Sequence, residues 1–117
     1  MSLMSEMTPD NKKLLSTLGL CARAGALVYG TDNVCVALRR GTPRGRICIV
    51  FEAEGCSENT HKKITDKCTY YNIDHRILPV DAATMAAALG RSGELAVVGV
   101  TDENLRRAVE KQLDAER

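Results

Sequence analysis

Two histidines and two neighbouring carboxylates are the residues of this sequence that could carry out acid–base chemistry. Glu52 and Glu54 come just after an apolar run, and paired carboxylates are one arrangement that acid–base catalysis uses. His61 stands beside two lysines early in a helical segment, and His75 stands at the start of a short strand. At such positions histidines usually face solvent, and acidic residues usually solubilise the end of a strand. We therefore expect both histidines to be exposed, and we expect no enzymatic activity from these four groups.

Five cysteines could form disulfides or hold a metal ion, but their spacing argues against both. They are Cys21, Cys35, Cys48, Cys56 and Cys68. The number is odd, no two of them form a Cys-x-x-Cys pair, and only two histidines exist to share a metal site. Cys21, Cys48 and Cys68 fall on apolar stripes, where a free cysteine behaves as a small hydrophobic residue. The sequence therefore predicts reduced, structural thiols, with no bound metal and no other cofactor.

The segment Gly30-Thr31-Asp32-Asn33 is the strongest candidate for a binding site. It follows a short apolar stretch and leads into a helix, so its backbone N–H groups lie at a helix amino terminus. Such a terminus attracts phosphate, and Gly30 lets a nucleic acid approach closely because it has no side chain. Asp32 and Asn33 add acceptors that suit the exposed edges of non-canonical guanine pairs. Taken alone, the same residues also describe an ordinary capped helix.

The sequence lacks the motifs of several enzyme and RNA-binding classes. It has no Gly-rich loop of the G-x-x-x-x-G-K type, no G-x-G-x-x-G after a strand and no G-x-S-x-G elbow. Modules that read single-stranded RNA stack bases on several exposed rings, whereas this chain has one phenylalanine and three tyrosines. Recognition of a folded RNA by its shape therefore fits the composition better than base stacking.

The charge of the chain is nearly balanced, but it is not evenly distributed. The net charge is +1, which by itself is a weak indication of nucleic-acid binding. Four arginines lie close together with no acidic residue between them: Arg39, Arg40, Arg44 and Arg46. This density makes phosphate contacts as plausible as a plain solvated surface.

Apolar periodicity and turn residues divide the chain into alternating helices and strands. Helices are predicted from Thr8-Pro9 to Gly25, from Gly30 to Gly41, from Ser57 to Asn72, from Asp81 to Gly90 and from Thr101 onwards, with strands at residues 26–29, 47–51, 75–78 and 95–100. This order predicts an α/β domain over residues 9–117 with helices on both faces of a sheet, after a disordered leader at residues 1–8. No apolar run approaches the roughly 20 residues of a membrane helix, and no secretory signal is evident, so a cytoplasmic protein is expected.

Several segments together resemble the YlxQ-type branch of the ribosomal proteins that include archaeal L7Ae and eukaryotic L30e. Residues 18–25 (LGLCARAG), followed by Leu27-Val28-x-Gly30, are similar to the first helix and turn of that branch. Residues 57–71 (S-x-N-T-x-K-K-I-T-D-K-C-x-Y-Y) are close to its most specific signature. Gly90 and residues 97–102 match its last helix junction and strand. The resemblance covers about residues 14–113.

The resemblance implies a three-layer α-β-α sandwich with a four-stranded mixed sheet and a face that binds kink-turn RNA. In relatives this face combines the amino end of the second helix with the loop before the fourth helix. Carried over to this sequence, the first part is Gly30, Thr31, Asp32, Asn33 and Val36, and the second part is Pro79, Val80 and Asp81. Kink-turn binders have Asn-Glu in place of Asp32-Asn33, and lysines in place of Ala26 and Val36. The candidates to replace that positive charge are Arg23, Arg39, Arg40 and Arg91.

The residues and the resemblance together predict a non-enzymatic, ribosome- or translation-associated protein that binds structured RNA. Its candidate partners are ribosomal RNA and proteins of the translation machinery. One alternative is a protein-interaction module that keeps the fold without binding RNA, which the uncharged Ala26 and Val36 favour and the arginine stretch disfavours. Another is an enzyme or its substrate-recognition domain, because some RNA methyltransferases resemble this fold in their leading domain. The lack of a cofactor loop in a chain of 117 residues argues against a complete enzyme.

Overall fold

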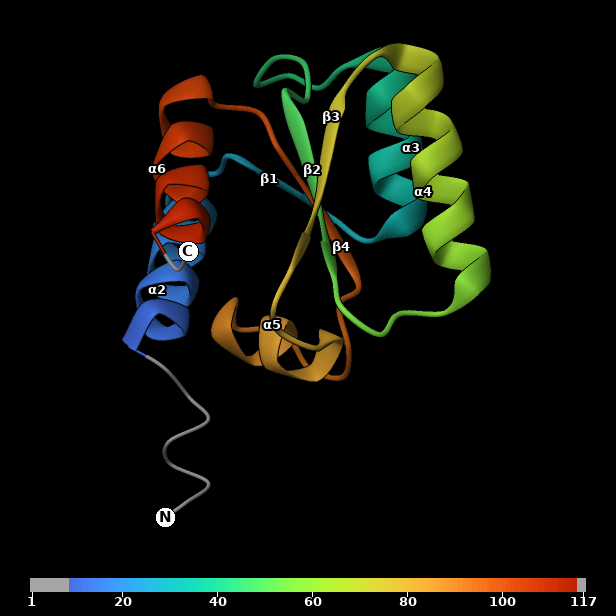
Figure 1. The fold of residues 1–117 in the computed structure, drawn as a ribbon. Coiled ribbons are helices and arrows are strands. Elements are labelled where there is room, and N and C mark those ends of the chain that lie inside the picture. Colours follow the sequence, from blue (N-terminus) through green and yellow to red (C-terminus); the bar gives the residue numbers. More distant parts are fainter. Residues whose placement is uncertain (1–8, 116–117) are drawn as a thin grey trace.

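Helices and strands alternate along the chain, as the apolar periodicity predicts (Figure 1). The computed structural model describes residues 9–115, so the predicted leader at residues 1–8, its cap Thr8 and residues 116–117 lie outside the described part. The helices are α2 (Pro9–Arg23), α3 (Thr31–Arg40), α4 (Glu58–Tyr71), α5 (Ala82–Ala88) and α6 (Glu103–Asp114). The strands are β1 (Leu27–Tyr29), β2 (Ile49–Ala53), β3 (Asp74–Leu78) and β4 (Val97–Val100).

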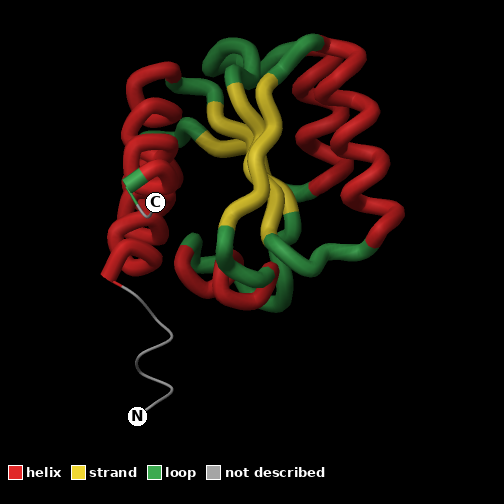
Figure 2. Tube along the Cα trace, in the orientation of Figure 1, coloured by secondary structure: helices red, strands yellow, loops and turns green. Residues whose placement is uncertain are grey.

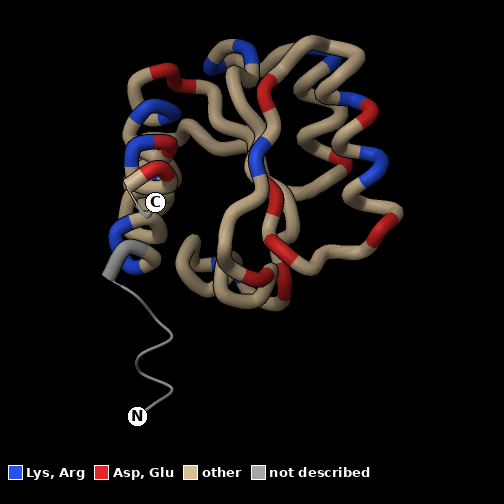
Figure 3. Tube along the Cα trace, in the orientation of Figure 1, with Lys and Arg blue, Asp and Glu red and all other residues tan. Residues whose placement is uncertain are grey.

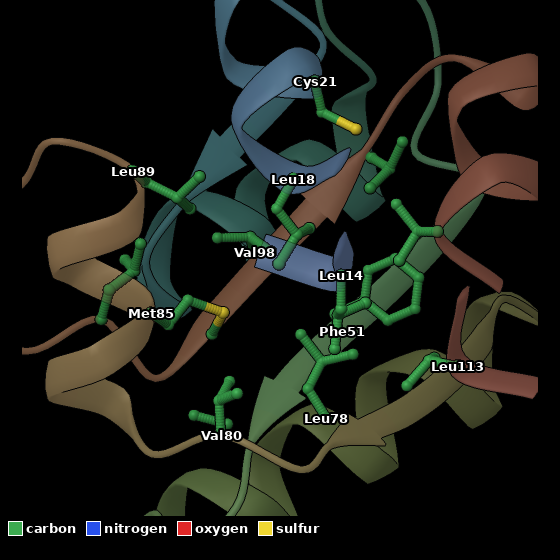
Figure 4. Packing of buried hydrophobic residues seen from close by; sticks show 14 of the residues in the cluster. Leu14, Leu18, Cys21, Phe51, Leu78, Val80, Met85, Leu89, Val98 and Leu113 are labelled. Carbon is green, nitrogen blue, oxygen red and sulfur yellow. The ribbon is translucent and has the colours of Figure 1, made fainter. Parts of the chain in front are cut away.

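The sheet is the middle layer of a three-layer α-β-α sandwich, which confirms the predicted fold class (Figure 2). Helices α3 and α4 pack on one face, and α2, α5 and α6 pack on the other. Successive residues of a strand point to opposite faces, so Phe51 of β2 enters the core under α2 and α5, whereas Val50 enters the core under α3 and α4. Figure 4 shows Phe51 between Leu14 of α2 and Leu78 of β3. β2 is therefore covered on both sides.

The strand directions bring four loops to one edge of the sheet. The strand order is β1-β4-β2-β3, in which β4 is antiparallel to both β1 and β2, and β2 is parallel to β3. Consequently β1, β2 and β3 end at the same edge at which β4 begins. We call it the loop edge, and it carries the turn at Gly30, the β2–α4 loop (54–57), the β3–α5 loop (79–81) and the α5–β4 loop (89–96).

The helix ends follow the capping residues that the sequence predicts. Ser57 accepts a hydrogen bond from the N–H of Thr60, and Asn72 ends α4 in the left-handed conformation with φ 58°. Asp102 caps α6 in the same way as Ser57 caps α4. None of the helices within residues 9–115 combines the length and the apolarity that crossing a membrane requires.

Two predicted strands are displaced along the sequence. β2 begins at Ile49 rather than at residue 47, and it continues through Glu52 and Ala53. β4 begins at Val97 rather than at residue 95. The predicted strand ended before Glu52 because a charged side chain is rarely buried. This prediction of its carboxyl end was wrong. Glu52 lies inside the strand and inside the protein.

The cysteines are free thiols and belong largely to the interior. Cys21 and Cys68 are buried, and Cys48 is half-buried with its sulfur donating to the carbonyl oxygen of Val100 at 3.2 Å. Burial raises the pKa of Cys21 and of Cys68 to about 11, so both remain protonated at neutral pH. The prediction of structural thiols is confirmed for these two residues.

Two glycines with opposite surroundings provide a test of the packing. A Cβ atom at Gly99 in β4 would lie 2.7 Å from Cδ1 of the buried Ile47, whereas a Cβ atom at Gly19 in α2 would meet nothing within 4 Å. We expect Gly99→Ala to lower the free energy of unfolding by about 1–3 kcal/mol through overpacking. Gly19→Ala should raise it by about 0.5–1 kcal/mol, because alanine favours the helix. Urea unfolding followed by circular dichroism measures both, and equal stability of the two variants would contradict this description of the core.

Candidate nucleic-acid interface

The turn between β1 and α3 is held by Gly30 in a conformation that only glycine adopts easily. Its φ is 91° and its ψ is 153°. The N–H of Gly30 donates to the carbonyl oxygen of Val97 at 2.9 Å, and its own carbonyl accepts from the N–H of Val34 at 2.9 Å. Because the cap residue is glycine, no side chain accepts a hydrogen bond from the first turn of α3. A Cβ atom placed at Gly30 would meet nothing within 4 Å. The amino end of α3 is therefore open to an incoming group.

Asn33 and Arg91 fasten this turn from two sides. The side-chain amide of Asn33 donates to the carbonyl oxygen of Tyr29 at 2.9 Å, so it orders the backbone that enters the turn. The guanidinium of Arg91, from the α5–β4 loop, lies 4.0 Å from the centre of the Tyr29 ring. The structure thus brings one predicted cation, Arg91, to the end of β1 beside the Gly30 turn.

Asp32 has a positive partner that the sequence alone did not reveal. Lys63 of α4 places its Nζ 3.2 Å from Oδ1 of Asp32, and both side chains are largely exposed. Such a surface pair contributes little to stability. Its effect is electrostatic, because Lys63 offsets the repulsion that Asp32 would exert on a nearby phosphate.

A groove between α3 and α4 continues from this pair. It has a volume of about 350 Å³ and is lined by Asp32, Cys35, Val36, Arg39, Lys63, Lys67 and Tyr71. We call it the basic groove, since three of its lining residues are cations and one is an acid. Lys63 and Lys67 stand four residues apart on α4, which places them on the same face of the helix. The sequence analysis did not assign Lys63 and Lys67 to the site. Their spacing of four residues was the feature of the sequence that could have indicated a shared basic face.

The dense arginine stretch does not surround Gly30. Arg39 and Arg40 are in the last turn of α3, and at 1.5 Å per residue they lie roughly 13 Å from its amino end. Arg39 still lines the basic groove. Arg44 is directed elsewhere, because its guanidinium lies over Gly25 at the end of α2. Figure 3 shows that basic residues are spread over both helix layers. Of the candidates for the missing positive charge, Arg39 and Arg40 therefore lie away from Gly30.

The second predicted segment, Pro79 to Asp81, lies at the loop edge but not beside Gly30. β1 and β3 are the two outer strands, with β4 and β2 between them, so their ends are about 14 Å apart. Val80 is buried, and Figure 4 shows it among the core side chains with Met85 and Leu89. Its side chain is not available to RNA, which corrects that prediction.

Acidic side chains surround the predicted Pro79–Asp81 segment. Asp81 caps α5 by accepting from the N–H of Thr84 at 2.7 Å, and this hydrogen bond lowers the pKa of Asp81. The hollow next to it is lined by Glu54, Asp81 and Glu94 among other residues. Three acidic groups disfavour phosphate, so the Gly30 turn is the part of the loop edge that suits an anion, and the basic groove leads away from it between α3 and α4.

A second cluster of polar side chains lies beneath the start of α4, and the sequence analysis misjudged it. Glu52 is buried, with Oε1 2.7 Å from Nε2 of His75 and Oε2 2.8 Å from Nδ1 of His61. Cys56 donates its thiol to Oε2 at 3.1 Å. Burial acts to raise the pKa of Glu52, but the hydrogen bonds from Cys56, His61 and His75 hold it below its ordinary value.

This cluster corrects two predictions. Glu52 does not solubilise the end of a strand, and His75 is not exposed, since its side chain is 14% accessible. His61 is half-exposed, as an early helical position suggests. The alternation of side chains along a strand could have indicated this burial. If β2 is extended to Ala53, Glu52 lies on the same face as the buried Val50.

Relatives with known names are similar over most of the chain. RNA-binding protein YlxQ of Bacillus subtilis (strain 168) is 34% identical over 97 residues, which are 83% of this chain and 91% of that protein. RNA-binding protein YlxQ of Enterococcus faecium is 36% identical over 64 residues, which are 55% of this chain and 58% of that protein. Both relatives are named after RNA binding and not after a reaction, in agreement with the expectation of a non-enzymatic protein.

Solved structures agree with this relationship. A Bacillus halodurans protein of unknown function has a TM-score of 0.75 and 31% identity, covering 87% of this chain and 97% of that one. The Giardia lamblia 15.5kD RNA binding protein has a TM-score of 0.66 at 14% identity over 92% of this chain and 88% of that one, which shows a shared fold. The sequence pattern of the ribosomal protein L7Ae/L30e/S12e/Gadd45 family matches residues 12–109. The chain therefore belongs to the ribosomal protein L7Ae/L30e/S12e/Gadd45 family.

Proposed function

We propose that this protein binds structured RNA, without catalysing a reaction, at the Gly30 turn and the basic groove. The observation that carries the proposal is the amino end of α3, where a Cβ atom at Gly30 would meet nothing within 4 Å. Arg91 lies over Tyr29 just before this turn, and Lys63 pairs with Asp32 just after it. Helix amino termini bind phosphate through their N–H groups, and charged side chains beside them strengthen the attraction. Family membership and the names of the YlxQ relatives support the same function.

The finer proposal is that the RNA contains a kink-turn, in which sheared G·A pairs expose guanine edges. Asp32 is exposed at the helix end and can accept hydrogen bonds from guanine amino groups. Lys63, Lys67 and Arg39 of the basic groove would contact the phosphates of the flanking strand. Thr31 and the exposed Val36 then face the RNA from the same helix. The Pro79–Asp81 segment and Arg40 lie outside this surface.

Arg91 has the geometry of a prearranged phosphate ligand. Its planar guanidinium is stacked on Tyr29, so fewer side-chain conformations are lost when it binds an anion. Arginine donates through a fixed fork that matches phosphate oxygens. We assign to Arg91 the position next to the kink, with ribosomal RNA or another cytoplasmic RNA of the translation machinery as the partner.

Protein binding on the same face is the second candidate. Val36 is 47% exposed and Tyr70 is 79% exposed, and each lines one of the two adjoining hollows between α3 and α4. Exposed apolar side chains of this kind are more typical of protein contacts than of phosphate contacts. The substitutions below test the RNA candidate directly, because lost phosphate contacts lower both the affinity and its salt dependence.

The lysines of the basic groove provide the first test. We expect the parent protein to bind a kink-turn RNA more tightly than a paired control without the G·A pairs. Lys63→Met with Lys67→Met should weaken binding to both RNAs by about tenfold for each lost cation contact. The slope of log affinity against log salt should fall by about one unit for each lost phosphate contact. Calorimetric titration at two or more salt concentrations measures both quantities.

The matched control for this test is Lys12→Met with Lys13→Met, which removes the same charge from exposed positions on α2 in the opposite helix layer. This control should bind both RNAs like the parent. If the two double variants lose the same affinity, the basic groove has no specific role and only net charge matters.

Gly30 provides the second test. Gly30→Glu should abolish the preference for the kink-turn, because a carboxylate would project into the open helix end and repel the RNA. The unfavourable φ should also lower the free energy of unfolding by about 1–3 kcal/mol. Gly45→Glu is the matched control, since Gly45 also has a positive φ of 119° and open space around it, but belongs to the turn at the opposite edge of the sheet. Equal RNA binding by the two variants in a gel-shift titration would place the RNA elsewhere.

A further inference from the structure

Three side chains from three different elements converge beneath the start of α4. They are Glu52 of β2, His75 of the neighbouring β3 and His61 of α4, and one potential ligand atom of each lies within 4.8 Å of the others. We propose that Glu52, His61 and His75 bind one divalent transition-metal ion of the zinc type. The proposal is independent of RNA binding, and it departs from the sequence analysis, which gave these residues no metal.

The donor atoms match zinc better than magnesium or calcium. Two imidazole nitrogens and one carboxylate oxygen form a set that Zn²⁺ and its neighbours accept, whereas Mg²⁺ and Ca²⁺ prefer oxygen ligands alone. Tetrahedral zinc with bonds of about 2.0–2.1 Å holds its ligand atoms about 3.3 Å apart. The observed Glu52–His61 and Glu52–His75 distances are 2.8 and 2.7 Å. The two histidines face different oxygens of the carboxylate, and the three ligand atoms lie within 4.8 Å of one another. An ion therefore requires the Glu52–histidine pairs to separate slightly while the set as a whole draws to tetrahedral spacing.

The electrostatics of the cluster also favour a cation. Among the side chains described for residues 11–115, Glu52 is the only charged group that is buried, and its ion-pair partners are the two histidines. Buried charges are normally paired or coordinate a metal. A dication between the carboxylate and the two imidazoles would place a full double positive charge against Glu52.

An access path leads to the cluster from solvent. A hollow of about 480 Å³ next to it is lined by Glu52, Glu54, Gly55, Cys56, Glu58, His61 and Ile77. Glu54 and Glu58 are exposed at its mouth, where their charges attract cations. Three protein ligands leave the fourth tetrahedral position for water, and we assign it to the side of this hollow.

The protons of the cluster balance when the ion enters. In the hydrogen-bonded form, Nδ1 of His61 and Nε2 of His75 donate to Glu52. Each imidazole can keep one proton on the ring nitrogen that faces away from Glu52, so both facing nitrogens become available as ligands, and a proton displaced from a doubly protonated ring passes to solvent. The thiol of Cys56 continues to donate to Glu52 and holds the carboxylate in orientation, as partners of metal ligands commonly do.

Titration of the tag-free full-length chain with ZnCl₂ after treatment with a chelator tests the proposal. We expect one Zn²⁺ per chain by calorimetry, a rise in Tm on zinc addition, and no response to MgCl₂. His61→Gln should weaken zinc binding by at least about tenfold and remove the rise in Tm, because a glutamine lacks the imidazole donor. Its side chain is half-exposed, so this variant should fold, and its circular dichroism spectrum should match that of the parent.

Cysteine controls separate this cluster from accidental thiol binding. Cys35→Ser changes a half-buried thiol on α3 outside the cluster and should leave zinc binding unchanged. Cys56→Ser keeps a donor to Glu52 and should retain one-to-one binding within a few-fold. Absence of one-to-one binding by the parent, equal affinity of His61→Gln, or loss of binding in Cys35→Ser would each overturn the proposal.

Discussion

The burial of β2 on both faces is the constraint from which the rest of the structure follows. All five of its residues are buried, and they supply side chains to the cores of both helix layers. A charged residue in such a strand must find partners inside the protein, because leaving it unpaired would cost several kcal/mol. Glu52 is that residue, and Cys56, His61 and His75 are its partners. The start of α4 is thus held over β2 by polar contacts, while the rest of the helix is held by Ile64 and Cys68.

The strand order then distributes charge along the loop edge. The ends of β1 and β3 are separated by two strands, so the loops that follow them form two different environments. On the β1 side, an open helix end meets Arg91 and Lys63, and on the β3 side Glu54, Asp81 and Glu94 surround a hollow. Because negative charges repel phosphate, this division disfavours a polyanion on the β3 side of the loop edge. The same acidic side leaves the opening above Glu52 attractive to a cation.

The fold could be predicted from the sequence to a greater extent than the site. The apolar periodicity and the capping residues give the order of the helices and strands. Gly41 and Asn72 end helices where expected, and Asp102 begins one. The site depended on which residues meet across elements, and one-dimensional patterns do not contain that information. Lys63 lies 31 residues from Asp32, and His75 lies 23 residues from Glu52. Local rules also failed at Glu52, where a charged residue continues a buried strand because distant histidines compensate for it.

The two proposed sites are connected through α4 and a short length of backbone. Glu52 pairs in the sheet with Val97, whose carbonyl oxygen accepts the hydrogen bond from Gly30 that fixes the turn into α3. On α4, His61 and Lys63 are two residues apart, so one points toward β2 and the other toward Asp32. The position of α4 over β2 therefore sets the distance between Lys63 and α3. The contacts of His61 with Glu52 and of Lys63 with Asp32 therefore both depend on how α4 is seated against the sheet and α3.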